Sequence, residues 1–298
     1  MTMLVPKIQT LAGQPYQSLN TFFQSIGPSA YYFSVDNSVG GQFVSPQGFI
    51  YEIPAFAFVD SWNQPVSGEV QLRVLEISNK RSLFYAGYSS LSNCSLLDMK
   101  YCLELEIVQE PRSGIRLGRF IRLVLPSGKN GRWSDCMVYQ KQTAKVHLLQ
   151  GDIRNIWAPS AIPLLLQKNG MGKEPGFYTA YTGAFMIGKE INKSKKAKKR
   201  AMISVVPDQS GPSLSHIQAY LVFHESDTIV QLEEQRGSFS AFHLPKGKKA
   251  SLLLIGLEKG TFYFYRSFLG SLSNQRIECC LQPINHHQLQ AELQRMIF

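Results

Sequence analysis

Few residues of this chain stand at spacings that support catalysis. The six histidines are scattered, and the adjacent pair His286 and His287 would point in different directions from the start of a helix. The sequence contains no G-x-S-x-G elbow and no H-E-x-x-H motif, and the glycine-rich stretch at 170–176 lacks the Lys-Ser/Thr ending of a phosphate-binding loop. We therefore predict a non-enzymatic protein with no catalytic residue, no metal site and no cofactor.

The cysteines give no support for a zinc site or a disulfide framework. There are five of them and they form no C-x-x-C pair; they are Cys94, Cys102, Cys136, Cys279 and Cys280. We expect mainly buried thiols, although Cys94 and Cys102 could also face each other across a hairpin. Cys279 and Cys280 would point to opposite faces of a strand, so they are poor partners for each other.

The net charge of +10 is concentrated in one short segment, KSKKAKKR, at 193–200. This basic loop carries six positive charges and no acid, on Lys193, Lys195, Lys196, Lys198, Lys199 and Arg200. Such a run is typical of a solvated loop, so no specific nucleic-acid partner is predicted. Binding of the loop to an anionic surface is the alternative, and it should weaken steeply with salt.

Aromatic side chains are the best candidates for ligand contact, because β-sandwich proteins often bind sugars on aromatic platforms. In TFYFYR at 261–266 the phenylalanines share one strand face and Tyr263 and Tyr265 share the other, so we expect the tyrosines to line a half-exposed face. Trp62 follows a strand in a turn, where exposure is expected. The candidate ligand-binding residues are therefore Trp62, Tyr263 and Tyr265.

The segment around Trp62 is predicted to be a strand, a turn and a second strand. It reads IPAFAFVDSWNQPVSGEVQLRVLEI at 53–77. The Asp60 carboxylate is well suited to accept backbone N–H bonds in the turn. We interpret Asp60 as a residue that shapes the corner, and Trp62 as the residue left for contact.

The remaining pattern is that of an all-β protein. Short runs such as EVQLRV alternate apolar and polar residues, and clusters of Gly, Pro, Asn and Ser separate them. A chain of 298 residues is long enough for two domains, and none of its apolar runs reaches the length of a transmembrane helix. We predict two β-sandwich domains in tandem with a short C-terminal helix, although a barrel is not excluded by the sequence alone.

The predicted domains follow from where the strand pattern starts and stops. The stretch 151–180, rich in Gly and Pro, shows no sustained period, and the C-terminal residues repeat leucine at helical spacing after the candidate N-cap Asn285. We predict an N-terminal extended arm at 1–29, a first sandwich at 30–150, an irregular connector at 151–180, and a second, immunoglobulin-like sandwich at 181–298 that includes a helix at about 286–297.

Two stretches carry a family resemblance, GGQFVSPQGFIYEIPAFAFVD at 40–60 and QPVSGEVQLRVLEI at 64–77. They resemble the N-terminal sandwich domain of a family of uncharacterised Bacteroidetes envelope proteins. That domain is in turn similar to the sandwich shared by zonula-occludens proteins, netrin receptors and ankyrins. Family members carry asparagine where this chain has Phe56. The resemblance implies a sandwich at 30–150 and a location in the cell envelope, periplasmic or at the surface.

These observations favour a structural or protein-interaction module, with a carbohydrate-binding protein as the alternative. The first residues lack the basic start and unbroken apolar core of a signal peptide, so a cytoplasmic location stays open beside the envelope. The partner, protein or glycan, and the oligomeric state are not determined by the sequence.

Overall fold

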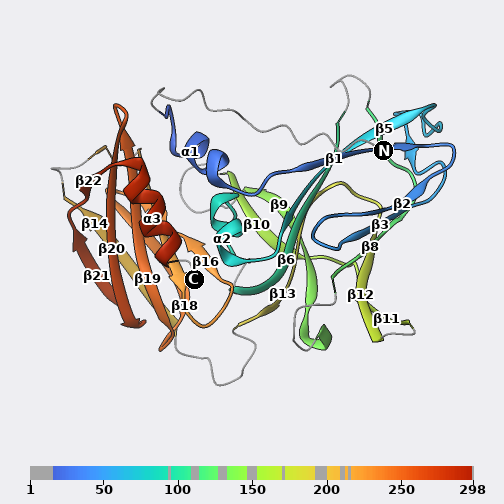
Figure 1. Cartoon of the computed structure of the whole chain (residues 1–298). Coiled ribbons are helices and arrows are strands. Elements are labelled where there is room, and N and C mark those ends of the chain that lie inside the picture. Colours follow the sequence, from blue (N-terminus) through green and yellow to red (C-terminus); the bar gives the residue numbers. More distant parts are fainter. Residues whose placement is uncertain are drawn as a thin grey trace. The chain divides into compact units, whose positions relative to one another are not determined.

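The structure is a computed structural model of the chain, shown in Figure 1. It describes the residues 16–92, 95–108, 114–126, 133–145, 153–169, 172–191, 200–208, 212–213 and 216–296. Strands dominate these residues, and the prediction of an all-β protein made of two sandwiches with a C-terminal helix is confirmed. The chain divides into two compact units.

The first unit is a sandwich of two mainly antiparallel sheets, made from Ser29–Ile77 and Lys100–Lys189 among the described residues. Six strands form one sheet, in the order β1 (Tyr31–Asp36), β5 (Glu69–Ile77), β6 (Leu97–Ile107), β13 (Gly183–Glu190), β9 (Met137–Lys145) and β10 (Ile153–Pro159). Five form the other, in the order β11 (Leu165–Asn169), β12 (Gly172–Thr179), β8 (Ile121–Val124), β3 (Ile50–Ile53) and β2 (Gly41–Val44). A short pair, β4 (Phe58–Val59) with β7 (Arg116–Leu117), and a 3₁₀ turn, η1 (Trp133–Asp135), complete it.

The core of the first unit is built from the inward-facing residues of both sheets. In β5 the side chains of Val70, Leu72 and Val74 are buried and alternate with more exposed neighbours. They join inward residues of β3 and β8, such as Tyr51 and Leu123, in one hydrophobic cluster. The period-two pattern read from the sequence is therefore the pattern of burial.

The second unit is a sandwich with helices on one of its outer faces. Its described residues are 16–28, 78–92, 95–99, 190–191, 200–208, 212–213 and 216–296. Four strands form one sheet, in the order β17 (Glu233–Gln235), β18 (Ser238–Pro245), β14 (Arg200–Pro207) and β21 (Gln275–Cys279). Five form the other, in the order β16 (Ile229–Gln231), β15 (Ile217–Phe223), β19 (Lys249–Glu258), β20 (Thr261–Ser271) and β22 (Gln282–Ile284). The helices are α1 (Leu19–Ile26), α2 (Lys80–Tyr85) and α3 (His286–Met296).

The central strand β19 is buried on both faces, which explains its unbroken apolar run. Leu252 and Leu254 face the core between the two sheets. Leu253 and Ile255 face a second core, which residues of the three helices cover, among them Leu293 of α3. A strand covered on both sides needs apolar residues at every position, so the alternation seen in β5 is lost here.

The C-terminal helix begins where the sequence indicated. Asn285 accepts a hydrogen bond from the backbone N–H of Gln288 at 2.9 Å, as an N-cap does. Leu289 and Leu293 are fully buried and form its apolar stripe. The predicted helix at about 286–297 is therefore observed at His286–Met296.

Two predicted segments differ from the structure. The expected extended arm at 1–29 contains α1, which Ser18 and Thr21 cap and whose Phe22 and Phe23 are buried in the second core. The expected irregular connector at 151–180 contains β10, β11 and β12 of the first sandwich. Both predictions are wrong for these described residues.

Some of the glycines and prolines that suggested an irregular connector lie in regular strands. Pro159 ends β10, and Gly176 lies inside β12, where a Cβ atom would come within 2.7 Å of the Leu123 carbonyl oxygen in β8. Glycine in a strand often marks such a close approach of two backbones.

The predicted domain boundaries also differ from those of the structure. The first unit runs to Lys189, so β13 belongs to the first sandwich and not to the second, and Ser78–Met99 belongs to the second unit.

Candidate functional site

The turn that carries Trp62 is held by one carboxylate. Asp60 Oδ1 accepts hydrogen bonds from the backbone N–H groups of Trp62 and Gln64, each at 2.9 Å. The backbone closes the same turn, because the Asp60 N–H donates to the Gln64 carbonyl at 2.9 Å. The interpretation of Asp60 as a corner residue is confirmed, and the Trp62 side chain is 79% exposed as expected.

Exposed apolar residues of the first unit gather at the end of the sandwich that carries this turn. Strand pairing places the connections before β2, around β4, before β8 and before β13 at this same end, which we call the loop end. Its exposed apolar side chains are Val39, Phe56, Trp62, Phe120 and Tyr181. Isolated exposed apolar residues are ordinary, but here five come from five different connections at one end of the sandwich.

Two arginines stiffen the loop end. Arg119 donates to the Ala55 carbonyl at 3.0 Å, and its guanidinium lies 5.9 Å from the centre of the Phe56 ring. Arg116 donates to the Asn63 side-chain oxygen, which ties β7 to the Trp62 turn. Within the described ranges neither arginine has a carboxylate at ion-pair distance.

The Phe56 backbone is strained. Its φ of +57° lies in the left-handed region, which bulky residues rarely adopt and which asparagine tolerates better. The Phe56 N–H donates to the Asn37 carbonyl. The buried Asn37 side chain in turn bonds the backbone of Phe58 and Val66, so the surrounding hydrogen bonds impose this conformation.

The tyrosine candidates of the second unit do not form an open platform. Tyr263 and Tyr265 are half-buried, as expected, but both pack against the core between the two sheets. On the other face of β20, Phe262 and Phe264 enter the core under the helices. Trp62 lies in the first unit, whereas Tyr263 and Tyr265 lie in the second.

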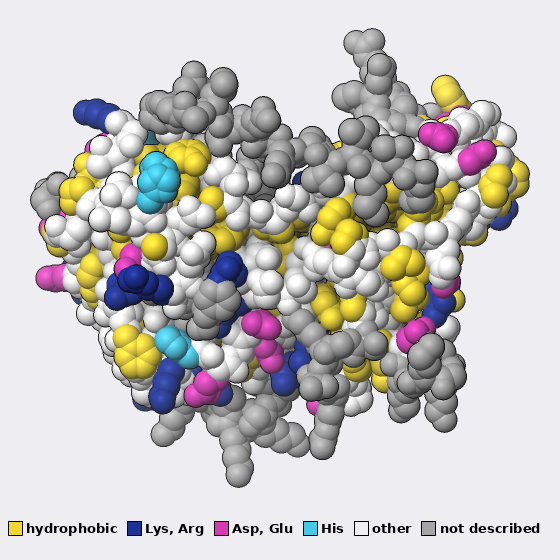
Figure 2. Space-filling model, viewed as in Figure 1, with side chains coloured by type: hydrophobic (Ala, Val, Ile, Leu, Met, Phe, Trp, Pro, Cys, Tyr) yellow, Lys and Arg dark blue, Asp and Glu magenta, His cyan; other side chains and the backbone are white. Residues whose placement is uncertain are grey.

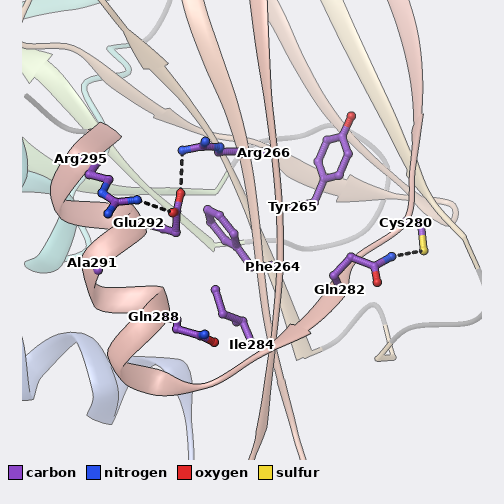
Figure 3. A pocket seen from close by; sticks show the side chains of 10 residues that line it. All are labelled: Phe264, Tyr265, Arg266, Cys280, Gln282, Ile284, Gln288, Ala291, Glu292 and Arg295. Atoms are coloured by element: carbon purple, nitrogen blue, oxygen red, sulfur yellow. Dashed lines mark hydrogen bonds and ion pairs between the residues drawn. The ribbon is translucent and has the colours of Figure 1, made fainter.

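One of these tyrosines does border a hollow of the second unit, shown in Figure 3. The hollow has a volume of about 670 Å³ and lies between β20, β22 and α3; we call it the β20 hollow. Phe264, Ile284 and Ala291 give it an apolar part. Its charged part is Arg266, Glu292 and Arg295, in which Glu292 accepts from Arg266 at 2.6 Å and from Arg295 at 3.2 Å.

A buried polar cluster joins the two sheets of the first sandwich. Glu76, at the end of β5, is 1% exposed and accepts hydrogen bonds from the Tyr51 hydroxyl at 2.6 Å and the Ser45 hydroxyl at 2.8 Å. Burial raises the pKa of Glu76 above its ordinary value, while the two hydrogen bonds oppose the rise. Burial, followed by the charge of Glu76, also raises the pKa of Tyr51.

Sequence reasoning missed Glu76, although a signal for it was present. Val70, Leu72 and Val74 define the inward face of β5, and Glu76 falls on the same face two residues further on. A carboxyl on a buried face needs partners, and the structure supplies two hydroxyl groups.

A serine–histidine pair in the second unit lacks the access that catalysis needs. His224 Nε2 lies 2.9 Å from the Ser251 hydroxyl, and burial together with Lys80 and Lys249 lowers the pKa of His224. A neutral imidazole beside a hydroxyl is part of a hydrolytic dyad. Ser251, however, is only 7% exposed in the middle strand β19, so its hydroxyl is not presented to a substrate. The pair links the residue that follows β15 to β19.

The lysines of the predicted basic loop, Lys193 to Lys199, lie outside the described residues. Its last residue, Arg200, begins β14, and its guanidinium lies 2.9 Å from His243 Nδ1. In the space-filling view of Figure 2, basic and acidic side chains are interspersed over the described surface of the second unit, so neither sign dominates this face.

The described residues contain no group of three or more His, Cys, Asp or Glu side chains placed to hold a metal ion. Within the same residues, no helix has the length and apolar character needed to cross a bilayer.

Comparison with known proteins found no matching family model and no matching curated protein.

Proposed function

We propose that this protein is a non-enzymatic interaction module that binds a protein partner through the loop end of its first sandwich. The observation that carries the proposal is the gathering of five exposed apolar residues at that end. They come from five separate connections held on rigid strands. Contact residues presented by loops on a rigid scaffold are a common arrangement for binding.

The local geometry supports recognition rather than chance exposure. Asp60 fixes the Trp62 turn from inside, and Arg116 fixes it from the neighbouring strand β7. A turn whose backbone is already fixed loses little conformational freedom on binding, and tryptophan and arginine are enriched among the residues that dominate protein interfaces. The strained Phe56 fits the same interpretation, since backbone strain is often retained at functional sites.

The proposal also includes a cellular location, a family and a type for the second sandwich. A place in the cell envelope, and membership of the Bacteroidetes envelope family, rest on the resemblance of residues 40–77. An immunoglobulin-like second sandwich is supported by its sheets of four and five strands, the numbers found in variable-type domains.

The binding test compares matched variants of the full chain. Immobilised protein is incubated with solubilised envelope proteins from the source cells, and the retained proteins are identified by mass spectrometry. Trp62→Ala with Phe120→Ala should lose a specific retained protein at least tenfold. Val44→Ala with Leu166→Ala removes exposed apolar side chains elsewhere on the sandwich and should retain it. Equal retention by both double variants would reject the loop end as the contact surface.

A sugar ligand is the second candidate, favoured by the surroundings of Trp62. The exposed indole lies in a turn with the Asn63 side chain and Arg116, so hydrogen-bonding groups flank an aromatic face. Tyr263 and Tyr265 are less suited, since they are half-buried against the core. Glycan-array binding that Trp62→Ala abolishes and Tyr263→Ala leaves intact would favour this candidate over a protein partner.

A further inference from the structure

Strand β20 has an edge that no described strand covers over most of its length. It pairs with β19 from Thr261 to Ser271 but with β22 only over Phe262–Phe264. Pro283 of β22 has no N–H and stands opposite Tyr263, so the hydrogen-bonded pairs with β22 fall on Phe262 and Phe264. The direction of the backbone N–H and C=O groups alternates along a strand. Those of Arg266 and Phe268 therefore point to the same side as those of Phe262 and Phe264, where no described strand lies opposite them.

The path of the chain explains why this edge stays open. Cys280 and Leu281 carry the chain from β21 in one sheet to β22 in the other. Leu281 is 3% exposed and inserts into the core between the sheets. Strand β22 therefore starts only at Gln282, and the β20 hollow lies where a longer β22 would have continued.

The side chains around this edge carry excess positive charge. Figure 3 shows Arg266 from β20 and Arg295 from α3 both directed at Glu292, so one carboxylate is shared between two guanidinium groups. Their side chains are 52% and 73% exposed. Each guanidinium has five N–H donors, so both retain donors for a further carboxylate.

We propose that the β20 hollow binds an extended peptide, which adds as a strand to β20 at Arg266 and Phe268 and places a carboxylate between Arg266 and Arg295. Uncovered backbone groups at a strand edge are satisfied by another extended chain. The apolar part of the hollow, at Phe264 and Ile284, receives a neighbouring side chain of the peptide. The site lies in the second unit and uses no loop-end residue, so it goes beyond the proposed function.

The test selects ligands from a bead library of random ten-residue peptides with free C-termini, using the labelled full chain. Enriched peptides should contain an acidic group, and fluorescence polarisation then measures their affinity. Arg266→Ser and Arg295→Ser should each weaken binding at least tenfold. Arg276→Ser, an exposed arginine of β21 in the other sheet, should change it less than twofold.

Changes to the peptide separate backbone pairing from charge alone. N-methylation at alternate residues removes the N–H groups that pair with β20 and should weaken binding at least tenfold. Amidation of the C-terminus shows whether the carboxylate is the peptide terminus or an Asp or Glu side chain, since it weakens binding only in the first case.

The proposal is overturned if no peptide is enriched. It is equally overturned if the N-methylated peptides bind the wild-type protein as tightly as the unmodified peptides do. The same holds if the enriched peptides bind Arg266→Ser and Arg295→Ser as tightly as they bind wild type. Trp62→Ala should leave peptide binding unchanged, so failure here and failure of the loop-end proposal are distinguishable.

Discussion

Replacing Glu76 by glutamine should make the stability of the first sandwich depend less on pH. The buried Glu76 carboxyl has a pKa raised above its ordinary value of 4.5, with burial as the largest cause. A group whose pKa is higher in the folded state stabilises the fold fully below the unfolded pKa, and this contribution is lost as pH rises through the folded pKa. Wild type should therefore lose stability above pH 4.5 that Glu76→Gln does not lose.

The expected change in stability of Glu76→Gln follows from the contacts of the Glu76 carboxyl group. Glutamine keeps one acceptor oxygen for Tyr51 or Ser45 and turns an amide donor towards the other hydroxyl, which should cost about 1–2 kcal/mol at pH 4. Between the unfolded and folded pKa values the wild-type curve should fall relative to the variant, by at most about 1.4 kcal/mol per pH unit for one proton. The disadvantage of the variant should thus shrink as pH rises.

The assay is urea unfolding followed by tryptophan fluorescence at intervals from pH 4 to 8. All three tryptophans, Trp62, Trp133 and Trp157, lie in the first unit, so the signal reports this sandwich. Glu69→Gln is the matched control, because Glu69 is an exposed carboxylate at the other end of the same strand. Its curve should run parallel to that of wild type. A Glu76→Gln curve parallel to wild type over the whole range would contradict the raised pKa of the buried Glu76 carboxyl.

Three further outcomes are expected. Asp60→Ala should lower the free energy of unfolding by about 1–2 kcal/mol in the same assay. Asp60→Asn keeps the acceptor oxygen and should lower it by under half as much. Equal losses would contradict the turn geometry. Phe56→Asn should raise the free energy of unfolding by about 0.5–1 kcal/mol, because asparagine tolerates the positive φ. A lower free energy of unfolding would show that the contacts of the Phe56 ring contribute more than the backbone strain costs. Burial raises the pKa of Cys279 to about 12, so this thiol should resist iodoacetamide at pH 8 while the exposed Cys280 reacts. Peptide mass spectrometry measures the labelling of each cysteine. Equal labelling would contradict the burial of Cys279.

Local patterns predicted those parts of the fold that depend on local physics. Alternation in EVQLRV identified a strand with one buried face, and Asn285 with the leucine repeat identified α3. Asp60 was assigned to the turn because a short carboxylate bonds nearby backbone N–H groups whatever the tertiary context.

Features decided by distant contacts were missed. The glycines and prolines of 151–180 suggested a loop, but Gly176 meets the Leu123 backbone of a strand some fifty residues earlier in the chain. Helix α1 has only eight residues, and its Phe22 and Phe23 are stabilised by the second core rather than by helix propensity.

The candidate sites show the same division. Exposure of Trp62 followed from its turn, whereas the gathering of Phe120 and Tyr181 beside that end depends on how the strands pair. The β20 hollow arises from the switch of the chain between sheets at Leu281, which no local pattern of the sequence reveals.

Site-specific photo-crosslinking in the source cells shows directly whether the loop end contacts a partner protein. A benzophenone amino acid is placed at Trp62 in one variant and at Val44, exposed on the edge strand β2, in another. Contact through the loop end should give one discrete cross-linked protein from position 62, absent from position 44 and lost when Phe120→Ala is added. Identical adduct patterns from the two positions, or none from position 62, would contradict it.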